Sequence, residues 1–360
     1  MFGTGLRNLR LFVYVCSLGF AGIALASCAG EQGGGETEGS ATADSGESTM
    51  LESSGMMSGE MPSDVEGLIS TSSQYGFDET VERLMQNVED GGNTVVATVD
   101  HAGAAEGIGE ELRPTTLVVF GNPAGGTPLM QAAQTTGIDL PQKALVWEDS
   151  GGQVWLSYND PQYLAERHGI TGMNEMLDMI STNLQNLAES TTGSEISGTM
   201  MESSTMMEDS TMMSSMSDVP GLVTVRSDVT FDETVSSIEA TVEEQDFTIV
   251  ANVDHSANAA TVDEELRPTT VIIFGKPTGG TPFMQASQTA GIDLPQKMLV
   301  WEGESGAVNI SYDDPQYLAE RHALGGVEAQ VEMVSDALES VAAAGAGEMM
   351  ESSMMEETTS

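Results

Sequence analysis

The chain repeats itself at a constant offset of 154 residues, and this duplication restricts its possible folds more than any other feature. Between residues 114–168 and 268–322, 39 of 55 positions are identical, without an insertion or a deletion. A unit of this length exceeds the roughly 20–50 residues of solenoid repeats. The sequence therefore predicts two tandem copies of one domain. Four pairs that mark the offset are Phe77 with Phe231, His101 with His255, Trp147 with Trp301, and His168 with His322.

Each copy contains helix-like and strand-like segments in the same order. In the first copy, apolar residues recur with helical spacing over 77–88 and over 173–187. Runs typical of strands occupy residues 94–99, 117–120, 144–147 and 154–158, the last two as a hairpin. The second copy repeats this pattern. We therefore predict the α+β class, with a mostly antiparallel sheet and packed helices in each copy.

Three kinds of local signal predict where helices begin. Thr230-Phe231-Asp232-Glu233 has the pattern of a capping box. Gly125-Gly126-Thr127-Pro128 lacks the Lys-Ser/Thr ending of a phosphate-binding P-loop, so we interpret Thr127 as an N-cap and Pro128 as the first helical residue. Asp160-Pro161 and Asp314-Pro315 predict the same arrangement before another helix.

Low-complexity segments rich in Ser, Thr, Gly, Glu and Met flank both copies. They contain few large branched or aromatic residues, so we expect them to remain unfolded. The predicted organisation is a signal peptide at 1–27, a tether at 28–64, a first domain at 65–189, a Met/Ser/Glu-rich linker at 190–217, a second domain at 218–344, and an acidic Met-rich tail at 345–360.

The N-terminus has the features of an export signal. Arg7 and Arg10 precede an apolar stretch at 11–25. This stretch is too short, and too interrupted by glycine, to predict a membrane span. Leu25-Ala26-Ser27-Cys28 matches the bacterial lipoprotein box, which predicts cleavage before Cys28 and lipidation of its thiol. An ordinary cleaved signal or an uncleaved anchor is the alternative. We thus expect a lipoprotein on the membrane of the cell envelope, facing away from the cytoplasm.

The chain is strongly acidic, with 56 Asp and Glu against 11 Lys and Arg and a net charge of −45. Nucleic-acid binding needs clustered cations and is therefore excluded. Such self-repulsion is tolerated best when salt screens it, which predicts a halophilic protein. Concentration of the acids in disordered tails is the alternative, but acids such as Glu243 and Glu244 lie within a predicted domain.

Each copy resembles the domain of unknown function 302 family over most of its length, including the upstream elements Asp100-His101 and Asp254-His255. The segments that carry this resemblance are Leu112-Arg113-Pro114-Thr115-Thr116, Phe120-Gly121-Asn122-Pro123, Gly126-Thr127-Pro128-Leu129-Met130-Gln131, Asp139-Leu140-Pro141-Gln142-Lys143, Ser157-Tyr158-Asn159-Asp160-Pro161 and 163–168, with the same string in the second copy. The resemblance implies small α+β domains that tend to pair, and it implies no established activity. The second copy departs at Lys276 for Asn122 and at Asn309 for Trp155.

Histidines, retained cations and aromatic residues are the candidate ligand-binding groups. A His beside an Asp could bind metal or move protons, or could be a structural His satisfied by hydrogen bonds. The cations could pair with buried carboxylates, or line an anion pocket walled by aromatic rings. The candidate pocket residues are Asp100, His101, Arg113, Lys143, Trp147, Tyr158, Arg167 and His168 in the first copy, and Asp254, His255, Arg267, Lys297, Trp301, Tyr312, Arg321 and His322 in the second.

Methionine pairs recur in the low-complexity segments. Thioethers mixed with carboxylates could hold Cu(I), because this ion prefers soft sulfur. They could instead absorb oxidants by forming sulfoxide, or reflect drift in an unselected linker. The candidate metal ligands are Met200, Met201, Met206, Met207, Met212 and Met213.

These observations predict a lipid-anchored extracytoplasmic protein that binds a small ligand or a soft metal, or that serves as a scaffold. The alternatives are a Met-rich oxidant scavenger and an enzyme that uses the Asp-His pairs for acid–base chemistry. The sequence contains no nucleophile motif or cofactor motif for an enzyme, and no catalytic residue is assigned. We also expect the two domains to pair with each other within the chain.

Overall fold

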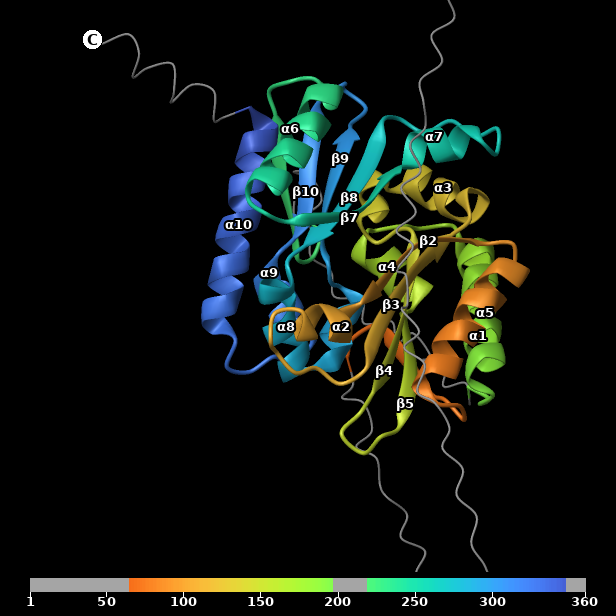
Figure 1. The fold of residues 1–360 in the computed structure, drawn as a ribbon. Coiled ribbons are helices and arrows are strands. Elements are labelled where there is room, and N and C mark those ends of the chain that lie inside the picture. The colour runs from red at the N-terminus through yellow and green to blue at the C-terminus, as the bar shows by residue number, and fades with distance from the viewer. Residues whose placement is uncertain (1–64, 197–218, 348–360) are drawn as a thin grey trace, which may run out of the picture. The chain divides into compact units, whose positions relative to one another are not determined.

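The computed structural model describes residues 65–196 and 219–347, which belong to one compact unit. Each repeat forms a five-stranded antiparallel sheet with helices packed on it, which confirms the predicted α+β class and the duplication (Figure 1). The strand orders are β1-β5-β4-β3-β2 and β6-β10-β9-β8-β7, so the two repeats share one topology.

The first repeat contains five strands, five α-helices and one 3-10 helix within its described residues. They are β1 (Leu68–Ser72), α1 (Phe77–Asp90), β2 (Thr94–Asp100), α2 (His101–Glu106), β3 (Thr115–Gly121), α3 (Pro123–Ala132), η1 (Gln134–Ile138), β4 (Gln142–Glu148), β5 (Val154–Asn159), α4 (Pro161–Arg167) and α5 (Asn174–Thr192).

The second repeat contains the equivalent elements. They are β6 (Leu222–Ser227), α6 (Phe231–Glu244), β7 (Thr248–Asp254), α7 (His255–Ala260), β8 (Thr269–Gly275), α8 (Pro277–Ala286), η2 (Gln288–Ile292), β9 (Gln296–Glu302), β10 (Val308–Asp313), α9 (Pro315–Arg321) and α10 (Glu328–Ala346).

Helix caps agree with the sequence in two of three cases. Thr230 and Glu233 form the capping box of α6, and the Asp160 carboxylate accepts a hydrogen bond from the backbone N–H of Gln162 at the start of α4. The prediction for Thr127 and Pro128 was wrong, because α3 begins five residues earlier. There Asn122 is the N-cap, and its side chain accepts from the N–H of Ala124. The turn formed by Asn122 and the first proline outcompetes the later Thr-Pro signal.

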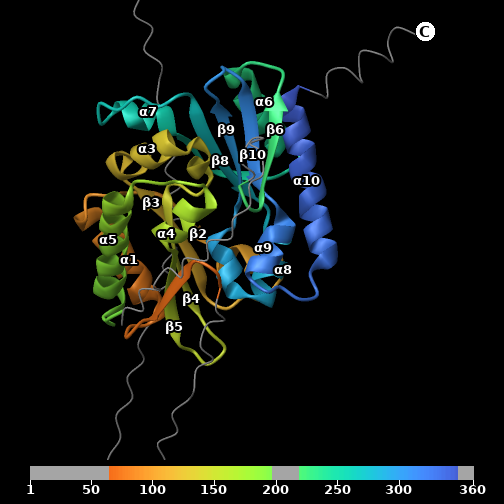
Figure 2. The ribbon, with the colours of Figure 1, turned by 180° about the vertical axis from the view of Figure 1, so that it is seen from behind.

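Each sheet has two apolar faces, because successive strand residues point to opposite sides. In β3, Val118 and Phe120 face the core that α1 and α5 cover, whereas Leu117 and Val119 belong to an apolar cluster that also contains residues of the second repeat. Figure 2 shows α10 and α6 beside the second sheet in the equivalent arrangement. Both faces are therefore buried, which explains the near-continuous apolar run of β3.

The 3-10 helices link the two repeats in a reciprocal manner. Ile138 of η1 lies in the cluster with Leu299 and Ile273 of the second sheet, and Ile292 of η2 lies with Leu145 of the first. Gly137 passes so close to Leu299 that a Cβ atom there would lie 2.9 Å from its Cδ1. Gly291 meets Leu145 at 3.0 Å in the same way. A side chain at either position would therefore displace the facing leucine, whereas glycine permits this close approach.

Two helices extend past the predicted domain ends. Helix α5 continues to Thr192 and α10 to Ala346, and each is followed by a glycine with positive φ that ends the helix. The predicted signal peptide, Cys28, the tether, and most of the linker and tail lie outside the described residues. No helix within 65–196 or 219–347 is long and apolar enough to cross a membrane.

Candidate functional site

The face between the repeats contains pairs of equivalent contacts. The side-chain amide of Gln134 donates to Thr269 at 2.7 Å, and that of Gln288 donates to Thr115 at 2.8 Å. The hydroxyls of Tyr163 and Tyr317, which are equivalent residues, lie 2.6 Å apart. Contacts that recur with the repeats exchanged are the pattern of a two-fold interface.

Asp139 lies at the centre of a buried polar cluster in the first repeat. Its Oδ2 accepts from Arg167 Nη1 at 2.9 Å and from His168 Nε2 at 2.8 Å, and its Oδ1 lies 3.7 Å from Lys143 Nζ. All four side chains are at most 5% exposed. Because an ionised carboxylate only accepts hydrogen bonds, His168 Nε2 carries a proton. The structure thus brings three of the predicted residues together, around a carboxylate.

The second repeat repeats this cluster around Asp293. Its Oδ2 accepts from Arg321 Nη1 and from His322 Nε2, both at 2.8 Å. Lys297 donates to the Asp293 backbone carbonyl at 2.9 Å, and its Nζ lies 3.3 Å from Asp313 Oδ2. The predicted Lys, Arg and His of this copy therefore also lie together.

The two clusters are connected by arginines that cross between the repeats. Arg167 Nη2 donates to Asp313 at 2.6 Å, and Arg321 Nη2 donates to Asn159 at 2.8 Å. Asn159 and Asp313 occupy equivalent positions, so one repeat supplies a neutral amide where the other supplies a carboxylate. The joined network contains four cations and three carboxylates, namely Lys143, Lys297, Arg167 and Arg321 with Asp139, Asp293 and Asp313.

Burial and mutual contacts shift the titration of this network. Burial would raise the pKa of Asp139, but Arg167, the hydrogen bond from His168 and then Lys143 hold that pKa well below its usual value. Arg321 and His322 likewise keep the pKa of Asp293 low against its burial. Burial, and then repulsion from Lys297, lower the pKa of Lys143 to about 8. Asp139 and Asp293 therefore remain ionised, and Lys143 is the cation that deprotonates most easily of these shifted groups.

A hydroxyl, a histidine and a carboxylate stand in line in each repeat. Thr135 Oγ1 lies 3.0 Å from His168 Nδ1, and Thr289 Oγ1 lies 3.0 Å from His322 Nδ1. This order is that of a nucleophile relay. Thr289 is only 2% exposed, however, and neither of the two cavities described below reaches Thr135 or Thr289. The hydroxyl and the histidine in each repeat therefore stabilise the buried network through their hydrogen bonds.

The histidines that follow the β2 and β7 strands lie elsewhere in the fold. His255 Nε2 lies 3.1 Å from the carbonyl of Gly137 in the other repeat, and His101 faces the backbone of Gly291. Burial lowers the pKa of each to about 4, although these backbone groups oppose the shift. The neighbouring Asp100 and Asp254 are N-caps that accept from Gly103 and Ala257. The Asp-His pairs therefore do not join His168 or His322 in a single contact cluster.

The remaining candidate residues are dispersed. Trp147 and Trp301 lie in or against the apolar cluster between the repeats, and each donates to a serine of the neighbouring strand. Tyr158 and Tyr312 lie on the other face of each sheet, in the core that the helices cover. Burial raises the pKa of Tyr312 to about 12. Arg113 is exposed and donates to Gln288, whereas Arg267 is half-buried and its Nη1 lies 3.6 Å from Glu304 Oε1.

A groove of about 860 Å³ lies on the first repeat between α3 and the α1–α5 pair, and we call it the α3–α5 groove. Its floor includes Phe120, Leu129 and Met130. The second repeat completes it with Val253, His255 and Asn258. Of the predicted pocket residues, His255 alone lines this groove. Its amide side chains are those of Asn87, Asn93, Asn122, Asn183, Asn186, Asn258 and Gln142.

The positions equivalent to the groove lining carry different side chains in the second repeat. Phe247, at the position of Asn93, packs edge-on against Phe274 with ring centroids 5.6 Å apart. Lys276, at the position of Asn122, places Nζ 4.7 Å from the centroid of Phe247. Gln330, at the position of Met176, donates to the Thr278 and Gly279 carbonyls at 3.1 Å. The two repeats therefore differ in their side chains at positions that line the α3–α5 groove of the first repeat.

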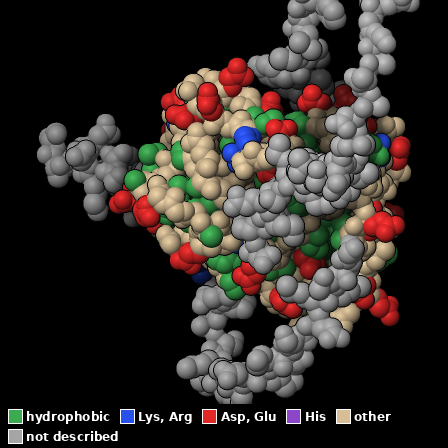
Figure 3. All heavy atoms as spheres, turned by 90° about the horizontal axis from the view of Figure 1, so that it is seen from below, with side chains coloured by type: hydrophobic (Ala, Val, Ile, Leu, Met, Phe, Trp, Pro, Cys, Tyr) green, Lys and Arg blue, Asp and Glu red, His purple; other side chains and the backbone are tan. Residues whose placement is uncertain are grey.

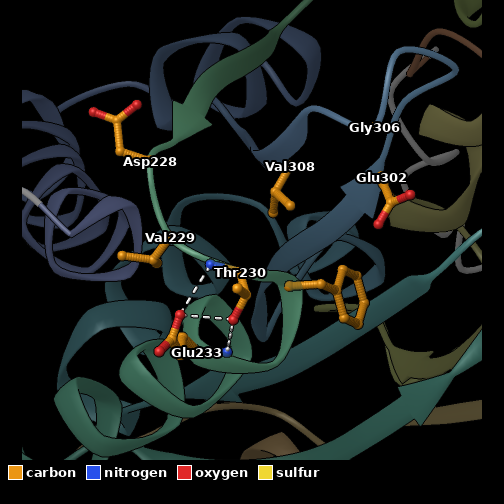
Figure 4. A pocket seen from close by; sticks show the side chains of 8 residues that line it. Asp228, Val229, Thr230, Glu233, Glu302, Gly306 and Val308 are labelled. Atoms are coloured by element: carbon orange, nitrogen blue, oxygen red, sulfur yellow. Dashed lines mark hydrogen bonds between the residues drawn. The ribbon is translucent and has the colours of Figure 1, made fainter.

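A second cavity, of about 480 Å³, lies at the start of α6 (Figure 4). Asp228, Glu233 and Glu302 line it together with Thr230. Glu233 accepts from the backbone and the hydroxyl of Thr230, so this carboxylate already closes the capping box. Two of the polar groups at this cavity, Thr230 and Glu233, thus serve the helix terminus.

The described residues contain no group of three or more His, Cys, Asp or Glu side chains that could hold a metal ion. The six linker methionines proposed as Cu(I) ligands lie outside these residues, and Cu(I) binding there stays a prediction.

Comparison with known sequences identifies the repeats. A family model described as "Domain of unknown function DUF302" matches residues 69–187 and 223–344. The chain belongs to the DUF302 family. A DUF302 crystal structure, of an uncharacterized conserved protein from Bacillus stearothermophilus, covers 35% of this chain and 98% of its own at 18% identity and a TM-score of 0.33.

Curated relatives match about one repeat of this DUF302 chain. Fluoride-specific ion channel FluC 1 of Brucella suis is 46% identical over 104 residues, which are 29% of this chain and 41% of the relative. FluC 1 of Brucella abortus and FluC 2 of Brucella melitensis match at the same identity over 38% of their lengths. The chain thus spans less than half the length of these relatives.

Sequence reasoning missed three parts of the site. It quoted Asp139 in the family string without assigning it a role, although its spacing of four from Lys143 recurs at Asp293 and Lys297. It also missed the exchange of Asn159 for Asp313, which is visible in the alignment of the copies. The α3–α5 groove had a weaker signal: five of its asparagines are replaced by Thr241, Phe247, Lys276, Ala337 and Ser340.

Proposed function

We propose that this DUF302 protein is a lipid-anchored scaffold of the cell envelope, in which two repeats act as one paired body. The observation that supports it is the buried network in which Arg167 and Arg321 each reach a carboxylate of their own repeat and a polar group of the other. An isolated repeat would expose this network and the apolar face around Leu117. Duplication within one chain keeps the partner at high effective concentration.

Two further observations fit a scaffold better than an enzyme. The Asp-His pairs that could have carried acid–base chemistry are used as helix caps and as contacts to the other repeat. The relatives named as fluoride-specific ion channels carry a segment like one repeat, which supports a position beside a membrane. Since most of each relative lies outside the match, we propose no channel activity. Lipidation of Cys28 would provide the attachment.

Hydrogen exchange on the mature chain tests the pairing. Leu338→Ala removes a side chain that is 2% exposed in the helix-side core of the second repeat, and should cost about 2–5 kcal/mol. In a paired body, backbone amides of β3 and β4 in the first repeat then exchange faster as well. Unchanged exchange in the first repeat would show that the repeats act independently. Leu184→Ala, at the equivalent position of the first repeat, is the mirror control and should speed exchange in the second repeat.

The anchor has its own test. Mass spectrometry of protein from the native membrane should find a diacylglycerol-type modification on Cys28, and Cys28→Ala should release the protein from the membrane fraction. An unmodified thiol on membrane-bound protein would contradict the lipoprotein part of the proposal and leave the pairing unaffected.

A further inference from the structure

The walls of the α3–α5 groove are rich in uncharged hydrogen-bonding groups. Asn183 and Asn186 lie on α5, Asn93 precedes β2, and Asn258 comes from the second repeat. A carboxamide offers two donors and an acceptor with two lone pairs, which match the N–H and C=O groups of a peptide. Because these residues are scattered in sequence and gathered in space, the walls favour a ligand that carries repeated amides.

Exposed apolar side chains lie between these amides. Val96 is 38% exposed and Met179 is 55% exposed, and they are two of the few large apolar residues at the surface of the described part. Val96 is the extra residue of a β-bulge between Val95 and Ala97, in the outermost strand of its sheet. Bulges turn side chains out of the ladder. Methionine adapts to varied apolar partners, so the surface suits side chains of more than one shape.

The length and charge of the groove narrow the ligand further. Its lining along α5 runs from Met176 to Ser190, about 21 Å at 1.5 Å per residue, which corresponds to about six residues of extended chain. Asp90 is the one carboxylate in the lining, and no Lys or Arg lines it. Figure 3 shows acidic side chains outnumbering basic ones on the face in view. An acidic ligand would therefore be repelled.

We propose that the α3–α5 groove binds an extended peptide segment that carries apolar side chains and no acidic residue, and that the second repeat has lost this site because five of the lining asparagines are replaced there. The peptide amides pair with the asparagines, and its apolar side chains contact Val96, Met179 and the floor. This division of roles accounts for the loss of five lining asparagines at the equivalent positions of the second repeat. The inference is independent of the anchor on Cys28, but it uses the second repeat as one wall.

A displayed library of random peptides about ten residues long, panned on the mature chain, tests the inference. Synthetic peptides made from the selected sequences are then titrated by calorimetry. We expect one site per chain and depletion of Asp and Glu among the selected peptides. Enrichment of acidic peptides, or binding of two peptides per chain, would contradict the proposal.

Variants that copy residues of the second repeat provide the decisive comparison. Asn93→Phe with Met176→Gln introduces the residues of the second repeat, where Phe120 offers the same ring contact as Phe274 and the Asn122 cap stays intact. Affinity for the selected peptides should fall at least tenfold. Gln330→Met, the mirror change in the second repeat, should leave the affinity for these peptides unchanged. Met179→Ser, at an exposed position, should weaken binding several-fold without affecting folding.

Two outcomes would overturn the inference. Peptides that bind the Asn93→Phe, Met176→Gln variant as well as the original chain would place their site outside the groove. Failure to enrich any peptide over that variant would show that the groove binds no peptide. The hydrogen-exchange test measures the coupling between the repeats and not peptide binding. The scaffold proposal therefore remains valid if this inference fails.

Discussion

The hydroxyls of Tyr163 and Tyr317 lie 2.6 Å apart, although the residues are 154 positions apart in the chain. Each ring also lies beneath an arginine of the other repeat, with Arg321 Cζ 4.8 Å from the Tyr163 centroid and Arg167 Cζ 5.1 Å from that of Tyr317. The pair therefore combines one hydrogen bond with two cation–π contacts at the point where the repeats exchange equivalent groups.

Replacing Tyr163 by Phe should destabilise the chain by about 1 kcal/mol. The change removes one hydrogen bond between the repeats and leaves the ring beneath Arg321. Urea unfolding followed by circular dichroism measures the effect. The double variant with Tyr317→Phe should cost no more than the single one, since both hydroxyls share one bond. Additive losses would show that the hydroxyls have separate partners.

Asp313→Asn should be among the most damaging single changes, because it removes one of three carboxylates from a network of four cations. Arg167 and Lys297 would both lose a charged partner while remaining buried. Breaking a buried ion pair in this way typically costs about 3–5 kcal/mol. The free energy of unfolding in urea measures the loss.

The swap Asn159→Asp with Asp313→Asn is the matched control. It moves the third carboxylate to the equivalent position, where Arg321 already contacts residue 159. The charge count is restored, so the swap should recover most of the stability that Asp313→Asn loses. If the swap is as unstable as the single variant, local packing around Asp313 and not the charge balance controls this site.

The secondary structure could be predicted because it depends on local spacing, whereas the site depends on contacts between the repeats. The stripe from Phe77 to Val88 became α1, and the run at 117–120 lies within β3. The Thr127 cap was wrong since two proline signals lie five residues apart and the earlier one has an Asn before it. Local rules rank such signals poorly when both are plausible.

The grouping of the candidate residues could not be deduced from the sequence. Strand alternation separates Trp147 from Tyr158 onto opposite sheet faces. His101 and His168 have different surroundings, because His101 follows the edge strand β2 and His168 follows α4. Only the pairing of the repeats decides which groups each of them contacts. The groove escaped notice because its lining residues are scattered in sequence over α1, α3, α5 and the second repeat, and only the fold brings them together.

Acidification should destabilise the protein before the carboxylates titrate. The pKa of His101 and His255 falls to about 4 in the folded state, against about 6.5 when unfolded. Between these values the unfolded state binds more protons, so stability is complete above about pH 6.5 and is lost as pH falls toward 4. Each histidine should contribute a loss of about 3 kcal/mol. Asp139 and Asp293, with lowered pKa, add their loss only at lower pH.

Urea unfolding at pH 7 and pH 4.5 measures this pH dependence. His255→Gln keeps a donor for the Gly137 carbonyl but has no titrating ring. The drop in stability between the two pH values should shrink by roughly 2 kcal/mol in this variant, whatever its stability at pH 7. An unchanged drop would mean that His255 does not carry the effect.

Salt should stabilise the folded chain, because a net charge of −45 on 360 residues produces strong self-repulsion. The Debye length falls from about 10 Å at 0.1 M to about 3 Å at 1 M salt, so repulsion between exposed acids is largely screened. The buried network is screened less, since it is shielded from ions. The midpoint of thermal unfolding should therefore rise with KCl over this range. Sorbitol at equal osmolality screens no charge and should give a smaller rise; equal effects would assign the stabilisation to solvent exclusion instead of charge.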